Sequence, residues 1–181
     1  ARLDLREPGV KAAFNVSGIR LAWADRCAVA VRQILQSNDA LRVFTDSKIR
    51  RAVLMALPAG LTPNCILVCA GVPRLAEPGI GQCSKLALSV QIGVCWEQPM
   101  ELLEDDEATI AAVFAEIIRA VLANPMLMVP TYGKRRLTDR VSDIRPLGPP
   151  MWQGGQGSVT LLDFIEIEFE KELDAQVWDI E

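Results

Sequence analysis

The sequence contains no histidine among its 181 residues. This absence excludes Ser-His-Asp triads, histidine-ligated zinc or haem, and an imidazole acid or base. The cysteines are odd in number and form no Cys-x-x-Cys pair, which predicts reduced thiols rather than a disulfide framework. They are Cys27, Cys65, Cys69, Cys83 and Cys95. No catalytic, cofactor-binding or metal-binding set of residues is predicted.

The chain also lacks an excess of positive charge. Its 19 Lys and Arg face 23 Asp and Glu, a net charge of −4, which argues against a protein that grips nucleic acid over a broad surface. An apolar signal-peptide core is missing near residue 1, and the longest uncharged run, residues 52–73, is interrupted by Pro58, Gly60 and Pro63. We expect synthesis in the cytoplasm and no membrane partner.

Half of the residues are hydrophobic, so the chain is expected to fold around one core. Residues 1–18 lack periodicity and contain Pro8 and Gly9, which predicts an extended arm before a single domain over 19–181. Apolar residues three and four apart predict a helix over 19–36. A short strand over 42–45 and a short helix over 46–57 are also expected.

Two strands are predicted in the middle of the chain. Cys65 to Ala70 is an apolar run between turn residues, and a proline-rich loop with Pro73 and Pro78 follows it. Leu86 to Trp96 alternates apolar residues at even positions with small or polar residues at odd positions. This alternation predicts an inner strand whose even positions face the helices.

The second half of the chain predicts a helix, a long loop and a last strand. Carboxylates at Glu104 to Glu107 precede a helical apolar stripe that Asn124-Pro125 ends. Periodicity fades over about 126–158, which predicts either a loose hairpin or a long loop. Ile165, Ile167 and Phe169 then alternate with glutamates, so the last strand has an acidic side, solvated or facing a partner. The glycines at 154–157 predict a flexible turn, because a phosphate loop would need a following Gly-Lys-Ser/Thr.

The expected fold is therefore α+β: a small, mostly antiparallel sheet with two main helices packed on one face, plus an N-terminal arm and a long loop. Charges within this fold supply the candidate interface residues. The long loop is basic and the last strand is acidic, so the two segments could pair between neighbouring subunits of a head-to-tail ring, although charged faces are usually only solvated. The candidates are Lys134, Arg135, Arg136, Arg140, Arg145, Glu166, Glu168 and Glu170.

Several local strings resemble a known family. The predicted first helix is followed by Arg-Val-Phe-Thr-Asp (42–46), Leu-Pro (57–58), the Cys-Ile-Leu-Val strand (65–68) and Leu-Ala-Leu-Ser-Val-Gln-Ile-Gly-Val-Cys-Trp (86–96). An acidic-capped helix, a variable loop and a final alternating strand complete the order. Over roughly residues 19–173, this pattern is similar to the tail-terminator and neck (head-tail completion) proteins of tailed bacteriophages.

The resemblance implies a non-enzymatic structural protein of the virion, without a cofactor. Such proteins assemble as a ring, commonly of six copies, at the head-proximal end of the tail, where the ring ends tube growth and joins the tail to the neck. The implied partners are further copies of the chain, the tail tube protein, the neck or connector proteins and the sheath. DNA would pass through the channel as cargo.

A different function class remains open from the residues themselves. A small cytosolic α+β enzyme or ligand-binding domain could use a carboxylate or a cysteine, with Cys27 and Cys83 as candidates. A cysteine nucleophile would then need a helix start or a nearby cation to lower its pKa, because no histidine is present. That function requires a deep site with perturbed titratable groups, whereas a ring requires large interfaces.

Overall fold

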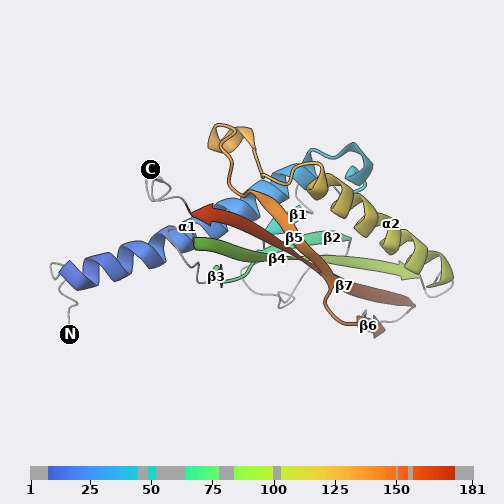
Figure 1. The fold of residues 1–181 in the computed structure, drawn as a ribbon. Coiled ribbons are helices and arrows are strands. Elements are labelled where there is room, and N and C mark those ends of the chain that lie inside the picture. The colour runs from blue at the N-terminus through green and yellow to red at the C-terminus, as the bar shows by residue number, and fades with distance from the viewer. Residues whose placement is uncertain are drawn as a thin grey trace.

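The structure is a computed structural model that describes residues 8–44, 49–51, 64–77, 84–99, 103–149, 151–154 and 157–173. Two long helices and a mixed sheet make up the described part of the chain (Figure 1). The helical elements are α1 (Pro8–Gln36), η1 (Asp39–Leu41), α2 (Leu103–Leu122) and η4 (Pro130–Tyr132). The strands are β1 (Ile49–Arg51), β2 (Cys65–Ala70), β3 (Arg74–Glu77), β4 (Ser84–Pro99), β5 (Arg140–Pro146), β6 (Met151–Gly154) and β7 (Ser158–Leu173).

The sheet has the strand order β1-β2-β4-β7-β5, with β3 also beside β4 and β6 also beside β7. Among these strands only β1 and β2 pair in parallel, and every other pairing is antiparallel. Both main helices lie on the same side of the sheet (Figure 1). These observations confirm the predicted α+β class with a mostly antiparallel sheet.

Two long strands form the centre of the sheet. β4 and β7 pair without a register shift from Ser84 with Leu173 to Pro99 with Ser158. At about 3.4 Å per residue, sixteen paired residues make a two-stranded ribbon roughly 50 Å long. The alternation at 86–96 therefore predicted the strand correctly, and the strand extends beyond it at both ends.

Each long strand has an interrupted partner on its outer side. β2 and β3 both pair with β4, and the chain between them contains Gly71 and Pro73. β5 and β6 both pair with β7, and Gly148 and Pro149 lie between them. Proline has no N–H to donate to a neighbouring strand, so a proline between two strand segments interrupts their pairing with β4 or β7.

The main core lies between the helices and the sheet. Its residues come from both helices, from even positions of β2 and β4, and from odd positions of β7. Val90, for example, has no exposed surface and pairs with Ile167 on the same face. The predicted orientation of β4, with its even positions toward the helices, is confirmed.

A smaller apolar cluster lies on the opposite face of the sheet. It contains Cys65, Leu67, Cys95 and Leu162, with the half-buried Phe164 packed against them. Gly93 pairs with Phe164, and a Cβ built on Gly93 would lie 2.5 Å from a carbon of the Phe164 ring. The glycine therefore makes room for the aromatic ring at the centre of the sheet.

The structure corrects the prediction for the N-terminal arm. The first helix begins at Pro8 rather than at Ile19, so residues 8–18 are helical instead of extended. Proline is well tolerated in the first turn of a helix, where its missing N–H has no intrahelical partner. Gly9 and Gly18 lower helix propensity without preventing a helix. Figure 1 shows this first part of α1 extending beyond the sheet.

Four further expectations were wrong or incomplete. Residues 42–44 form a turn after η1 instead of a strand, and Ile49 to Arg51 forms β1 instead of helix, because the buried Ile49 pairs with Ile66. The proline-rich loop contains β3. Of the two alternatives for 126–158, the structure shows parts of each: a loop with η4 precedes β5, and β5 and β6 both pair with β7 as one broken arm of a hairpin. Thr45 and the rest of the predicted 46–57 helix lie outside the described residues.

Candidate functional site

The acidic row on β7 lies on the face of the sheet opposite the helices, and arginines from two directions cover it. Arg145 on β5 binds Glu166, with its Nε 2.9 Å from Oε1. Arg140, also on β5, binds Glu170, with its Nε 2.7 Å from Oε2. Antiparallel pairing of β5 with β7 places each arginine opposite its glutamate, so these ion pairs follow directly from strand register.

A third arginine, which the sequence analysis did not select, completes the row. Arg74 on β3 reaches across β4, and its Nη2 lies 2.6 Å from Oε2 of Glu168. The Glu168 side chain is only 14% exposed, whereas that of Arg74 is 59% exposed. The arginines therefore shield carboxylates that the sequence analysis expected to be solvated or to face a partner.

Glu166 is the most buried of these carboxylates. Burial raises its pKa, but hydrogen bonds from Gln91 and Arg145, together with the charge of Arg145, outweigh burial and lower that pKa below its ordinary value. The hydrogen bond and the negative charge of Glu166 in turn raise the pKa of Arg145. Glu166 and Arg145 are thus both charged at neutral pH and form a structural ion pair.

These contacts lie within one chain, whereas the sequence alone suggested that the basic and acidic segments could pair between neighbouring subunits. Five of the candidate residues, namely Arg140, Arg145 and the three glutamates, take part in these ion pairs. The remaining candidates, Lys134 to Arg136, are all exposed and lie elsewhere, in the loop between α2 and β5. Arg136 forms an ion pair with Asp139, and Lys134 forms none with the described residues.

That loop, residues 126–138, is closed at its base and fixed to α1. The carbonyl of Met126 accepts hydrogen bonds from the backbone N–H groups of Leu137 and Thr138. The buried indole N–H of Trp23 on α1 donates to the carbonyl of Leu137 over 2.7 Å. A compact loop with joined ends holds its tip in a defined position.

The outer part of the loop makes further contacts with α1. Gln33 both donates to and accepts from the hydroxyl of Thr131, at 2.6 and 2.9 Å. The Arg26 guanidinium lies 5.9 Å from the centre of the Tyr132 ring, within the range of a cation–π contact. Gly133 and Lys134 then adopt left-handed backbone conformations that turn the chain at the tip.

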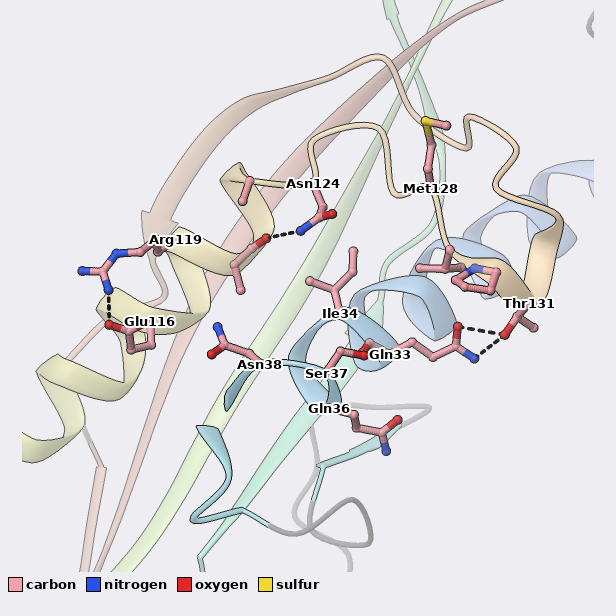
Figure 2. A pocket seen from close by; sticks show the side chains of 14 residues that line it. Gln33, Ile34, Gln36, Ser37, Asn38, Glu116, Arg119, Asn124, Met128 and Thr131 are labelled. Atoms are coloured by element: carbon pink, nitrogen blue, oxygen red, sulfur yellow. Dashed lines mark hydrogen bonds and ion pairs between the residues drawn. The ribbon is translucent and has the colours of Figure 1, made fainter. Parts of the chain in front are cut away.

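A groove of about 790 Å³ separates this loop from the helices. Figure 2 shows Thr131 and Gln33 bound to each other at one end, and the Arg119–Glu116 ion pair on α2 at the other. Ile34 and Met128 contribute apolar surface to the lining. The lining is mostly amide, hydroxyl and aliphatic, and its charged side chains are those of Glu116 and Arg119.

The candidate cysteine of the enzyme hypothesis is inaccessible. Cys27 has no exposed surface, and burial raises the pKa of its thiol, opposite to what a nucleophile requires. Cys65 and Cys95 lie opposite each other in β2 and β4, a pairing that the sequence spacing could not reveal. The pKa of the Cys95 thiol is raised, first by a hydrogen bond with Cys65 and second by burial. Cys83 lies outside the described residues.

The described residues contain no group of three or more His, Cys, Asp or Glu side chains placed to hold a metal ion. Within the same residues, neither α1 nor α2 combines the length and the apolar character of a membrane-crossing helix. The four described cysteines, Cys27, Cys65, Cys69 and Cys95, form no disulfide with one another.

Neither the family models nor the curated proteins contain a match to this chain. Among solved structures, the fold is similar to a chain of the "Virion of native gene transfer agent (GTA) particle". The two share 14% sequence identity with a TM-score of 0.43, and the match covers 79% of this chain and 93% of the other.

Proposed function

We propose that this chain is a structural protein of a tailed, phage-like virion. It assembles as a ring at the head-proximal end of the tail, ends tube growth, joins the tail to the neck and leaves a channel for DNA. Its partners are further copies of itself, the tail tube and the neck or connector proteins, with the sheath where a tail has one. It performs no catalysis and requires no cofactor.

The order of the elements carries this proposal. The family resemblance implies a helix, a buried strand, a long alternating strand, an acidic-capped helix, a variable segment and a final alternating strand. α1, β2, β4, α2, the 126–154 segment and β7 follow one another in that order. The two most distinctive strings, Cys65–Val68 and Leu86–Trp96, lie in paired strands near the centre of the sheet. In this proposal DNA only passes through the channel, because a channel that bound phosphates tightly would impede the movement of DNA.

The complete burial of Cys27 disfavours an enzyme that uses Cys27 as its nucleophile. The side chains of Leu122, Met126 and Met128 favour an interface, because these three exposed apolar residues lie within seven positions of one another.

Light scattering coupled to size-exclusion chromatography, followed by negative-stain electron microscopy, tests the proposal. We expect one closed ring with a central channel, of about six times the 19.9 kDa chain mass. Gold-labelled antibodies against the chain should mark purified particles where the tail meets the head. Labelling elsewhere on the particle, or a strict monomer within it, would contradict the proposed role.

A further inference from the structure

Two cysteines lie opposite each other in the sheet. Cys65, the first residue of β2, pairs with Cys95 of β4 in the antiparallel register. Both side chains are buried in the small cluster on the face opposite the helices. Directly opposed residues of an antiparallel pair have Cα atoms about 4.5–5.5 Å apart. A disulfide needs Cα atoms about 4.4–6.8 Å apart, so the register places these two residues within bridging distance.

The hydrogen bonds between β2 and β4 specify this separation more closely. The N–H of Gly71 donates to the carbonyl of Ser89, directly opposite, over 2.8 Å. Such hydrogen-bonded pairs alternate with non-hydrogen-bonded pairs along an antiparallel ladder. The pair of Cys65 with Cys95 is an even number of positions away along β2, so it is also a hydrogen-bonded pair, with Cα atoms about 5.5 Å apart. This value is close to the commonest Cα separation in disulfides.

Contacts around the two cysteines hold them in place. The Oδ1 of Asn64 accepts a hydrogen bond from the backbone N–H of Glu97 over 3.0 Å, which ties β2 to β4 immediately beyond the cysteines. The two thiols are hydrogen-bonded to each other. Leu67 and Leu162 belong to the same buried cluster. The sulfur atoms are therefore adjacent and ordered before any bond forms, which favours a reaction between them.

The other two described cysteines are poorly placed to compete for this pairing. Cys69 lies on the same face of β2 as Cys65, but four residues along the strand, which is about 13 Å. Cys27 lies on α1, in the main core on the other side of the sheet. Within the described ranges, Cys65 and Cys95 are thus the pair of cysteines that strand register brings together.

We propose that Cys65 and Cys95 form a disulfide when the protein passes from a reducing to an oxidising environment. With oxidised glutathione as the oxidant, one cysteine thiolate attacks a glutathione sulfur and one glutathione leaves. The other cysteine thiolate then displaces the second glutathione from the mixed disulfide. Overall, two protein S–H bonds break and one protein S–S bond forms. The two electrons and two protons reduce the glutathione disulfide to two thiols.

The bond joins β2, and with it the β1 edge of the sheet, covalently to the central strand β4. It closes the loop from residue 65 to residue 95, which includes β3, and so restricts the unfolded chain. Burial of both thiols keeps the exchange slow. The inference goes beyond the proposed function and does not depend on it, although a virion that leaves the cytoplasm meets this change of environment.

Oxidation of the folded wild-type protein by oxidised glutathione, followed by alkylation and tandem mass spectrometry without reductant, tests the site. We expect a link between Cys65 and Cys95 that dithiothreitol reopens. A single tryptic peptide, residues 52–74, contains both Cys65 and Cys69. Cys69→Ala is therefore the matched control, because it should form the same link, whereas Cys65→Ala and Cys95→Ala should not. Circular dichroism verifies that each variant is folded.

Thermal unfolding provides the second measurement, in which each protein is compared with itself before and after oxidation. Closing the bond should raise the melting temperature by about 5–10 °C in the wild type and in Cys69→Ala. The melting temperatures of Cys65→Ala and Cys95→Ala should not change on oxidation. Complete alkylation of Cys65 and Cys95 in the oxidised wild type overturns the proposal. A link that forms only in urea, or that joins Cys69 or Cys83 instead, overturns it as well.

Discussion

On the face of the sheet that α1 and α2 cover, nearly every described side chain of β4 and β7 is apolar and buried. On the opposite face, Cys95 of β4 and Leu162 and Phe164 of β7 form a small cluster with residues of β2, and β7 also carries a row of glutamates bound by arginines. At Val90 and Ile167 the first face is fully buried and apolar, and the charged residues that β7 places on this face, Asp163 and Lys171, are only half-buried. The second face buries carboxylates because each has an arginine partner: Glu166 and Glu170 have one directly opposite on β5, and Arg74 reaches Glu168 from across β4.

Placing a charge on the covered face should have the largest effect. Val90→Asp puts an unpaired carboxylate into the main core and should cost several kcal/mol, about 4 or more, which abolishes folding or solubility. Val72→Asp is the matched control, because Val72 is 82% exposed. Equal urea midpoints for the two variants would show that β4 does not face the core at this position.

Changing the close contact on the other face should have an intermediate effect. Gly93→Val forces a side chain into the Phe164 ring and should cost about 1–3 kcal/mol. Gly154→Val adds the same atoms where a Cβ meets nothing within 4 Å, and should change stability much less. In a double-mutant cycle by urea denaturation, Phe164→Ala should remove most of the Gly93→Val penalty. Additive penalties would mean that the two residues do not touch.

The ion pairs should give the smallest effect, and it should depend on pH. Because its folded-state pKa is lowered, Glu166 contributes stability above its ordinary value of 4.5, and this contribution disappears as the pH falls through the lower folded value. Arg145→Ala and Glu166→Gln should each lower the melting temperature at pH 7. Each variant should also lose less stability on acidification than the wild type. An unchanged acid dependence in both variants would show that this pair makes no contribution.

Sequence reasoning worked where a periodicity was long enough to be recognised. It predicted β2 with its observed bounds, β4 as an inner strand, and a helix that opens with the acidic residues of α2. It missed β1, because three residues carry no period, and Ile49 is strand only through its pairing with Ile66. It missed β5 because tertiary pairing, rather than local pattern, makes a charged segment into an edge strand.

The charged candidates show the same limit. Sequence identified the basic and acidic segments correctly, but it could not tell that β5 would lie beside β7 and satisfy Arg140 and Arg145 within one chain. No local sequence pattern pointed to Arg74 as a partner of Glu168, because the two residues are 94 positions apart in the sequence. Strand order decides which charges remain for a partner, and strand order is a property of the whole fold.

The pairing of β4 with β7 also has a consequence for how the chain folds during synthesis. The paired residues are separated by 59 positions at Pro99 and Ser158, and by 89 positions at Ser84 and Leu173. One edge of β4 therefore emerges from the ribosome long before the strand that will cover it. Until β7 arrives, sixteen residues of unpaired backbone are exposed to other nascent chains, and pairing of such distant segments is slow. Rapid, crowded synthesis should consequently favour aggregation over soluble protein.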